Sequence, residues 1–259
     1  TEATIDLSAY IGQTITLAFK YAGNDGNGWF VDEVEVAAIT PIFLVNGNWN
    51  DANCWNTGSV PAEGSDVIIR ADAIVPAGYA AEANMVSLEG GSITVADGGQ
   101  LRHNTPDLVV TMKKNIEGYD DVNGKGNYYL LAFPFFGMVE VPAAMTANEG
   151  SDFYDFDPNF QDAEWRNNKQ TAINYVYRKA GYLYASPESF ELSVTGSTYA
   201  LNTEFAETVT VEYDEGSSNP SNGWALLGNP FTYNAYIYRQ TDNGEIEPLP
   251  IMMYDANGE

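Results

Sequence analysis

The chain has 259 residues and carries 36 acidic against 11 basic side chains, a formal net charge of −25 at pH 7. Duplex nucleic acid presents about one negative charge per 1.7 Å, so this charge balance argues against nucleic acid as a partner. It argues equally against binding to anionic membrane surfaces. No apolar run approaches the roughly 20 residues that span a bilayer, so membrane insertion is not expected.

The composition favours strands. Aromatic residues make up 13% of the chain, with 17 tyrosines, and they are mixed with Thr, Val, Ile, Gly and Asn, as in strands joined by tight turns. The single cysteine, Cys54, allows no intrachain disulfide, so the size of the core must supply the stability. We therefore predict an all-β chain of three units.

Residues 1–40 are expected to form strands. Ile15, Leu17 and Phe19 alternate with polar or small residues at period 2, a loop rich in Gly, Asn and Asp at 23–28 reverses the chain, and 30–36 form a further strand. Some forty residues cannot close a sandwich alone. These strands must pair with the rest of the chain or belong to a truncated domain.

Two segments of this unit carry a family resemblance. IDLSAYIGQTI (5–15) followed by GNGWFVDEV (26–34) resembles the C-terminal strands of the cleaved-adhesin and choice-of-anchor jelly rolls. These domains occur in secreted Bacteroidetes proteins, including the haemagglutinin regions of gingipains. The resemblance implies a jelly-roll fold that often carries structural calcium. Where the family has an Asp-Asp pair near the end of the last strand, this chain has Asp32 and Glu33.

Calcium takes oxygen ligands from carboxylates, amides and backbone carbonyls in flexible loops. The leading candidate ligands are Asn24 and Asp25 together with Asp32 or Glu33. Two other acidic segments, 120–124 and 152–157, are weaker candidates. The second lacks the glycine that an EF-hand loop requires. The alternative in each place is an Asx turn without metal.

Residues 41–106 are predicted to form a short β-solenoid-like segment. Apolar pairs separated by Gly and Asp turns recur about every ten residues, which favours stacked short strands over long hairpins. GNWNDANCW (47–55) and VPAEGSDVII (60–69) also resemble a segment that opens β-helix-like regions in surface proteins of the same bacteria.

Residues 107–259 are predicted to form an antiparallel β-sandwich or barrel. NYYLLAFPF (127–135) is echoed by GWALLGNPF (223–231), and each copy is expected to be a buried strand that ends at its proline. GYLYA (181–185) and the second copy resemble a C-terminal region of proteins exported by type IX secretion.

Catalytic residues are not predicted. The chain has one histidine, His103, and one cysteine, too few for a catalytic zinc site or a Cys/His nucleophile pair. His103 precedes Asn, Thr and Pro, so we expect a solvated turn histidine. Paired carboxylates for glycoside hydrolysis remain an alternative, although no pair among the 36 acidic residues is marked by its setting.

Aromatic side chains offer a second kind of site, because a ring combines apolar stacking area with a polar handle. Trp165 lies in the polar segment 161–169 and is predicted to be an exposed loop residue that stacks on a sugar. The alternative is that it folds back onto the core. The other candidates, more simply interpreted as core or cross-strand ladder residues, are Trp49, Trp55, Tyr175, Tyr177, Tyr182 and Tyr184.

These observations lead to one functional expectation and one alternative. The resemblance implies a secreted or cell-surface protein, located outside the outer membrane. We expect a non-catalytic adhesion or ligand-binding module whose partners are glycans or host glycoproteins, with calcium as structural reinforcement. The alternative is an ancillary or spacer region of a secreted enzyme, a protease or glycosidase, whose catalytic domain lies outside this chain.

Overall fold

The chain divides into two compact units, Thr1–Thr40 and Pro41–Glu259. The computed structural model describes residues 5, 7, 10, 14–20, 22–23, 31–32, 34–35, 39–120, 126–158, 164–170, 172–198, 200, 211, 213–236, 238–240 and 243–248. Within the described part of the second unit the helices are the 3-10 turn Ala52–Cys54 and α1 (Ala143–Thr146), and the rest is strand or loop. The predicted all-β class is confirmed. No helix among the described residues is long and apolar enough to cross a membrane.

The described residues of the first unit form no strand, which differs from the strands predicted there. The side chains of Thr14–Lys20 are all exposed, including Ile15, Leu17 and Phe19. An alternating strand is stabilised by covering its apolar face. Within the described part of this unit, that face lies open.

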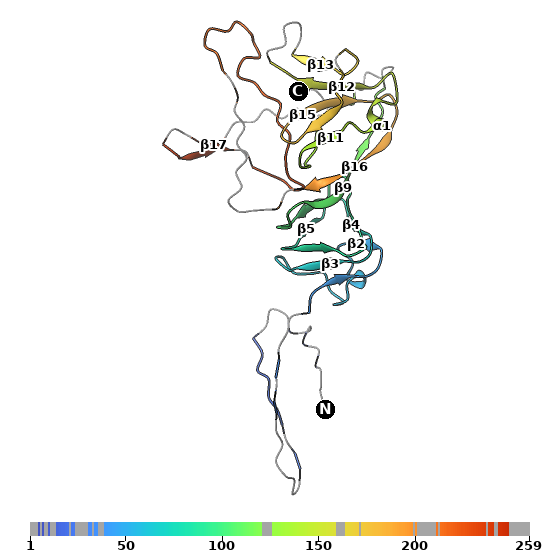
Figure 1. Ribbon diagram of the computed structural model, residues 1–259, viewed down its shortest axis with the longest axis vertical. Coiled ribbons are helices and arrows are strands. Elements are labelled where there is room, and N and C mark those ends of the chain that lie inside the picture. The colour runs from blue at the N-terminus through green and yellow to red at the C-terminus, as the bar shows by residue number, and fades with distance from the viewer. Residues whose placement is uncertain are drawn as a thin grey trace. The chain divides into compact units, whose positions relative to one another are not determined.

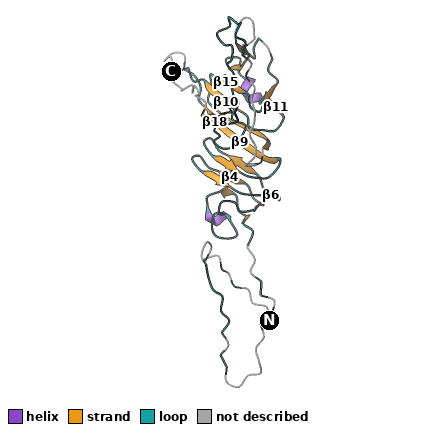
Figure 2. Cartoon of the chain, turned by 90° about the vertical axis from the view of Figure 1, so that its left-hand side faces the viewer, coloured by secondary structure: helices purple, strands orange, loops and turns teal. Residues whose placement is uncertain are grey.

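The second unit begins as a β-helix, in which short parallel strands stack rung on rung (Figure 1, Figure 2). Three sheets make its sides. The first consists of β1 (Ile42–Phe43), β3 (Val67–Ile69) and β6 (Val86–Leu88). The second contains β2 (Gly47–Asn48), β4 (Ala73–Val75), β7 (Ile93–Val95) and β9 (Leu108–Ile116). The third pairs β5 (Ala80–Glu82) with β8 (Gln100–Arg102).

The later rungs occupy 19 or 20 residues, since Ile68 pairs with Ser87 and Ala81 pairs with Leu101. The first rung is longer, because Ile42 pairs with Ile68, 26 residues on. A rung holds three strands, so strands start closer together than the ten-residue spacing expected from the sequence. The difference arises because each turn between strands needs only a few residues, and a single glycine often makes it. Gly78 and Gly98, both at positive φ, stack in consecutive rungs, where the Gly78 N–H donates to the Gly98 carbonyl at 3.0 Å.

Alternate side chains of each short strand point into the β-helix. Val67 and Ile69 are 1% and 0% exposed while Ile68 between them is half-buried, as the period of 2 requires. Aromatic side chains close the first rung. Trp55 packs edge-on against both Phe43 and Trp49, with ring centroids 5.0 and 5.1 Å away, and its indole N–H donates to the Trp49 carbonyl at 2.8 Å.

Polar side chains form ladders along the turns of the β-helix. The Asn84 amide donates to Asp66 at 2.7 Å and accepts from the Asn104 amide at 2.9 Å. On another turn, Asp72 accepts a hydrogen bond from Ser92 at 2.7 Å, and its backbone N–H donates to Asn46 at 2.9 Å. Each ladder links one rung to the next and satisfies polar groups at the turns.

The strand pairing changes from parallel to antiparallel after β9. β16 (Phe190–Thr198) pairs with β9 antiparallel along nine residues, so the solenoid sheet continues into the rest of the unit. A four-stranded antiparallel sheet follows, in the order β10 (Tyr129–Ala132), β15 (Gly181–Ala185), β12 (Asp152–Phe156) and β13 (Trp165–Asn167). Two ribbons complete the unit, namely β11 (Met138–Glu140) with β14 (Tyr175–Tyr177), and β17 (Tyr238–Gln240) with β18 (Ile246–Pro248).

The two copies of the sequence echo adopt different structures. The first forms β10, which ends at Ala132 before Pro134. The second, predicted to be a buried strand, contributes only an isolated bridge between Leu227 and Ala180. Gly228 explains the close approach, because a Cβ there would lie 2.3 Å from the Ala180 carbonyl oxygen. The second copy therefore packs beside the start of β15 and does not extend the sheet.

Candidate functional site

The predicted calcium ligands fall mostly outside the described residues. This is true of Asn24, Asp25 and Glu33, whereas Asp32 is described and exposed. In the part of the chain that the structure describes, no three His, Cys, Asp or Glu side chains are grouped so as to hold a metal ion. Calcium at the first loop stays a prediction.

Basic side chains engage the carboxylates of the segment 152–157. Arg166 forms a two-pronged ion pair with Asp155, which raises the pKa of the guanidinium, and a further pair with Asp157 at 3.2 Å. Lys169 and the Asn167 amide each donate to Asp152 at 3.0 Å. The segment is the strand β12, and its carboxylates hold the β12–β13 pair together.

The aromatic candidates divide between core and surface. Four of them, Trp49, Trp55, Tyr182 and Tyr184, are at most 3% exposed and belong to the core. Tyr175 and Tyr177 are 41% and 49% exposed on β14. Their partners across the ribbon are Glu140 and Met138, so the exposed face of this ribbon carries both tyrosines.

Trp165 is exposed as predicted, although it lies on the edge strand β13 and not in a loop. Its side chain is 37% exposed. It lies opposite Phe156 of β12, and the two rings meet edge-on with centroids 5.1 Å apart. Within the segment predicted to be a loop, Trp165–Asn167 form a strand because pairing with β12 satisfies their backbone and Arg166 reaches across to Asp155.

Strand register places four more apolar side chains on the same side of the sheet as Trp165. Leu130, Leu183 and Tyr154 face one another across β10, β15 and β12, and Phe156 follows Tyr154 at the i+2 position. Leu130 is 45% exposed and the other three are half-buried. We call the surface formed by these five residues the outer face: Leu130, Tyr154, Phe156, Trp165 and Leu183.

The opposite side of the same sheet is core. Leu131, Phe153, Tyr182 and Tyr184 are at most 7% exposed, and the Phe153 ring packs against both tyrosine rings. One face of the sheet is therefore packed into the core, which fixes the positions of the partly exposed outer-face side chains on the other.

Polar groups border the outer face at both ends. Beside Trp165, the Glu164 carboxylate accepts from the Ser221 hydroxyl at 2.8 Å. Hydrogen bonds from its own backbone N–H and from Ser221 lower the pKa of Glu164. At the other end, burial and the nearby Asp152 carboxylate raise the pKa of Tyr128 to about 12, so this phenol keeps its proton and its donor capacity at neutral pH.

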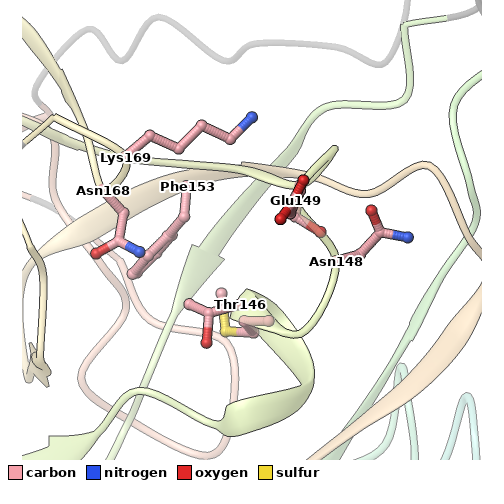
Figure 3. Close-up of a pocket in the computed structure, with 8 residues that line it drawn as sticks. Thr146, Asn148, Glu149, Phe153, Asn168 and Lys169 are labelled. Atoms are coloured by element: carbon pink, nitrogen blue, oxygen red, sulfur yellow. The ribbon is translucent and has the colours of Figure 1, made fainter.

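A cavity of about 260 Å³ lies next to this polar end. Its lining comes from α1, from the turn before β12, from β12 itself and from the residues after β13. Figure 3 shows Lys169 on one side and Thr146 opposite, Asn168 and Phe153 at one end, and Glu149 and Asn148 at the other. The remaining lining residues are Met145 and Ser151.

His103 is not at this site and is not a solvated turn residue, so that prediction was wrong. Its ring is 1% exposed and lies at the junction of the β-helix with β16. The sequence could not show that Thr198, 95 positions away, would cover it.

Sequence reasoning missed four of the five outer-face residues. A usable signal was present: three of the five residues 152–156 are aromatic, and aromatic residues are enriched in strands. The acidic spacing in that segment led instead to a metal hypothesis.

No protein-family model matches the chain, and neither the curated proteins nor the solved structures contain a match.

Proposed function

We propose that the chain is a non-catalytic module of a secreted or cell-surface protein, which binds glycans or host glycoproteins through the outer face. One observation carries the proposal. Trp165 keeps 37% of its surface exposed while Phe156 and the β12 pairing hold its ring in place. A fixed, exposed indole can stack on the C–H face of a sugar with little loss of side-chain entropy.

The surroundings of Trp165 support the same proposal. Leu130, Tyr154 and Leu183 extend the apolar surface across three further strands, and Glu164 and Asp152 lie at its two ends. Sugars present apolar C–H faces and hydroxyl groups that both donate and accept hydrogen bonds. The apolar side chains of the outer face suit the C–H face of a sugar, and the polar groups at its two ends suit the sugar hydroxyl groups.

The experiment is binding of the purified chain to an array of glycans and host glycoproteins, with millimolar calcium and again with chelator. Trp165→Ala should weaken each hit about tenfold, because a lost aromatic contact costs about 1 kcal/mol or more and 1.4 kcal/mol is tenfold. Tyr177→Ala is the matched control, since it removes an exposed aromatic from the separate β11–β14 ribbon. Equal losses in both variants would contradict the proposal.

A second candidate is a spacer or ancillary region of a secreted enzyme. The β-helix favours it, because stacked rungs joined by side-chain ladders make a stiff element that can hold other parts of a protein apart. An array without hits in either buffer would support this candidate over the first.

We also propose that calcium reinforces the first unit through Asn24, Asp25, Asp32 and Glu33. The support is the supply of oxygen ligands in this part of the sequence, together with the resemblance to calcium-carrying jelly rolls.

A further inference from the structure

The cavity beside β12 combines an apolar floor with directed polar groups. Met145 and Phe153 are 0% and 2% exposed and line its base. Ligand pockets for drug-sized molecules usually have volumes of about 300–1,000 Å³. A volume of about 260 Å³ therefore suits one small ring and excludes an extended chain.

Asn168 supplies a fixed hydrogen-bond donor. Its Oδ1 accepts from the backbone N–H of Ile173 at 2.6 Å, and a backbone N–H can only donate, so the side-chain nitrogen must be the other atom of the amide. No described residue accepts from that nitrogen. In Figure 3 it points toward Phe153. A ligand over the floor thus meets an amide donor.

Lys169 and Glu149 complete the polar lining. Lys169 gives one of its three donors to Asp152 at 3.0 Å and retains the others, while Asp152 neutralises its charge. The Glu149 carboxylate is exposed, no described side chain pairs with it, and it is an acceptor for ligand hydroxyls. The lining therefore carries no net positive charge to attract an anion, in a chain whose formal net charge is −25.

We infer that this cavity binds a single N-acetylated amino-sugar residue, an inference that rests on the glycan-binding function proposed above. The acetyl methyl group lies over the apolar floor, and the acetyl carbonyl accepts from the Asn168 amide. Ring hydroxyls donate to Glu149. A neutral sugar without the acetyl group leaves the floor and the Asn168 donor unused, and an amino sugar with a free ammonium group places a donor beside the Asn168 amide where the acetyl carbonyl would supply an acceptor.

The test is titration of the intact chain with N-acetylglucosamine, glucose and glucosamine, followed by saturation-transfer NMR or calorimetry. We expect an N-acetylglucosamine Kd on the order of a millimolar, as for other ligands of this size. Glucose and glucosamine should each bind at least about fivefold more weakly, because each forgoes at least one net hydrogen bond. Equal affinity for the three sugars would overturn the inference.

Two matched variants test whether the sugar binds in the cavity beside Asn168. Asn168→Asp keeps the acceptor for the Ile173 N–H, removes the donor and adds one negative charge, so binding of N-acetylglucosamine should weaken at least about tenfold. Asn148→Asp adds the same charge to the same cavity. The Oδ1 of Asn148 accepts from the Gly150 N–H at 2.8 Å, and in Figure 3 its amide nitrogen points away from Phe153. The affinity of the Asn148→Asp variant for N-acetylglucosamine should stay within about twofold of that of the parent chain. Equal losses of affinity in both variants would overturn the inference.

Trp165→Ala separates this inference from the proposed function. If N-acetylglucosamine binding survives in Trp165→Ala, the sugar occupies the cavity, as we infer. If it disappears, the sugar lies on the outer face and the inference is wrong while the proposed function stands. Array hits without any N-acetylglucosamine binding would likewise overturn only the inference. Binding of N-acetylglucosamine without array hits that depend on Trp165 would support the cavity and contradict the outer face.

Discussion

The Nε2 atom of His103 lies 3.0 Å from the Oγ1 atom of Thr198, joining the last rung of the β-helix to the end of β16. The Thr198 hydroxyl donates its own hydrogen to the Leu108 carbonyl at 2.8 Å, so it can only accept from the imidazole. This fixes the tautomer with the proton on Nε2. Both side chains are 1% exposed, and burial lowers the pKa of His103 to about 4.

The lowered pKa predicts a loss of stability in mild acid. In the unfolded chain His103 binds a proton near pH 6.5, whereas in the folded chain it stays neutral down to about pH 4. Between these values the unfolded state binds more protons, so the free energy of unfolding falls as the pH falls, by up to about 3 kcal/mol. Below about pH 4 this group causes no further loss.

Urea denaturation at pH 7 and pH 4 measures this effect. His103→Gln keeps an amide donor toward Thr198 but does not titrate, so it should lose about 3 kcal/mol less than the parent over this interval. Titration of the 36 carboxylates affects both proteins alike. A parent and variant with the same pH dependence would show that another group is responsible.

Gly91 should not tolerate a side chain. A Cβ there would lie 2.4 Å from the carbonyl oxygen and 2.6 Å from the backbone nitrogen of Ala71, atoms of the neighbouring rung that cannot move independently. Gly91→Ala is expected to destabilise the chain by about 1–3 kcal/mol, measured as the midpoint of urea unfolding. Gly126→Ala, whose Cβ meets nothing closer than 3.8 Å, should change stability by less than about 0.5 kcal/mol.

The asparagine ladder should contribute measurably to stability. Asn84→Ala removes hydrogen bonds to both Asp66 and Asn104 and should cost about 1–2 kcal/mol in thermal or urea unfolding. Ser87→Ala, an exposed position on β6, is the control. Asn84→Ala combined with Asn104→Ala should cost less than the sum of the single changes, because the two residues share a hydrogen bond. Strict additivity would argue against a connected ladder.

Calcium should bind to the first unit with the weak affinity typical of extracellular modules. With a Kd of about 10⁻⁴–10⁻³ M, 10 mM calcium stabilises the folded state by about 1.4–2.7 kcal/mol. Asp25→Asn and Asp32→Asn should each reduce the heat of calcium binding in calorimetry, and magnesium at equal ionic strength is the control. Titrations that give no heat in the parent chain would refute calcium binding.

Two pairs of tyrosines show where prediction from sequence stops. Tyr175/Tyr177 and Tyr182/Tyr184 have the same i, i+2 spacing, which establishes that each pair shares a face. The first pair is exposed on a two-stranded ribbon and the second is buried in the core. Which face is covered depends on packing partners far away in the chain, such as Phe153 against Tyr182, and one sequence does not reveal them.

The β-helix and Trp165 also show that local patterns were predicted and long-range pairing was not. Short apolar pairs between glycine turns indicated stacked strands, because that pattern is local. The rung length depends on register between residues 19 or 20 positions apart and was not predicted. The polar neighbours of Trp165 correctly indicated that its side chain is exposed. Its strand conformation was not predicted, because it depends on pairing with β12.

The rung also sets a unit of length. Neighbouring strands lie about 4.8 Å apart, so each added block of 19 or 20 residues lengthens the β-helix by about that distance. The aromatic contacts of Trp55 in the first rung and the pairing of β9 with β16 would stay unchanged. A protein built in this way can change its reach by duplicating one short segment of its gene. The distance between the two ends of the β-helix can therefore change while the residues of the outer face stay the same.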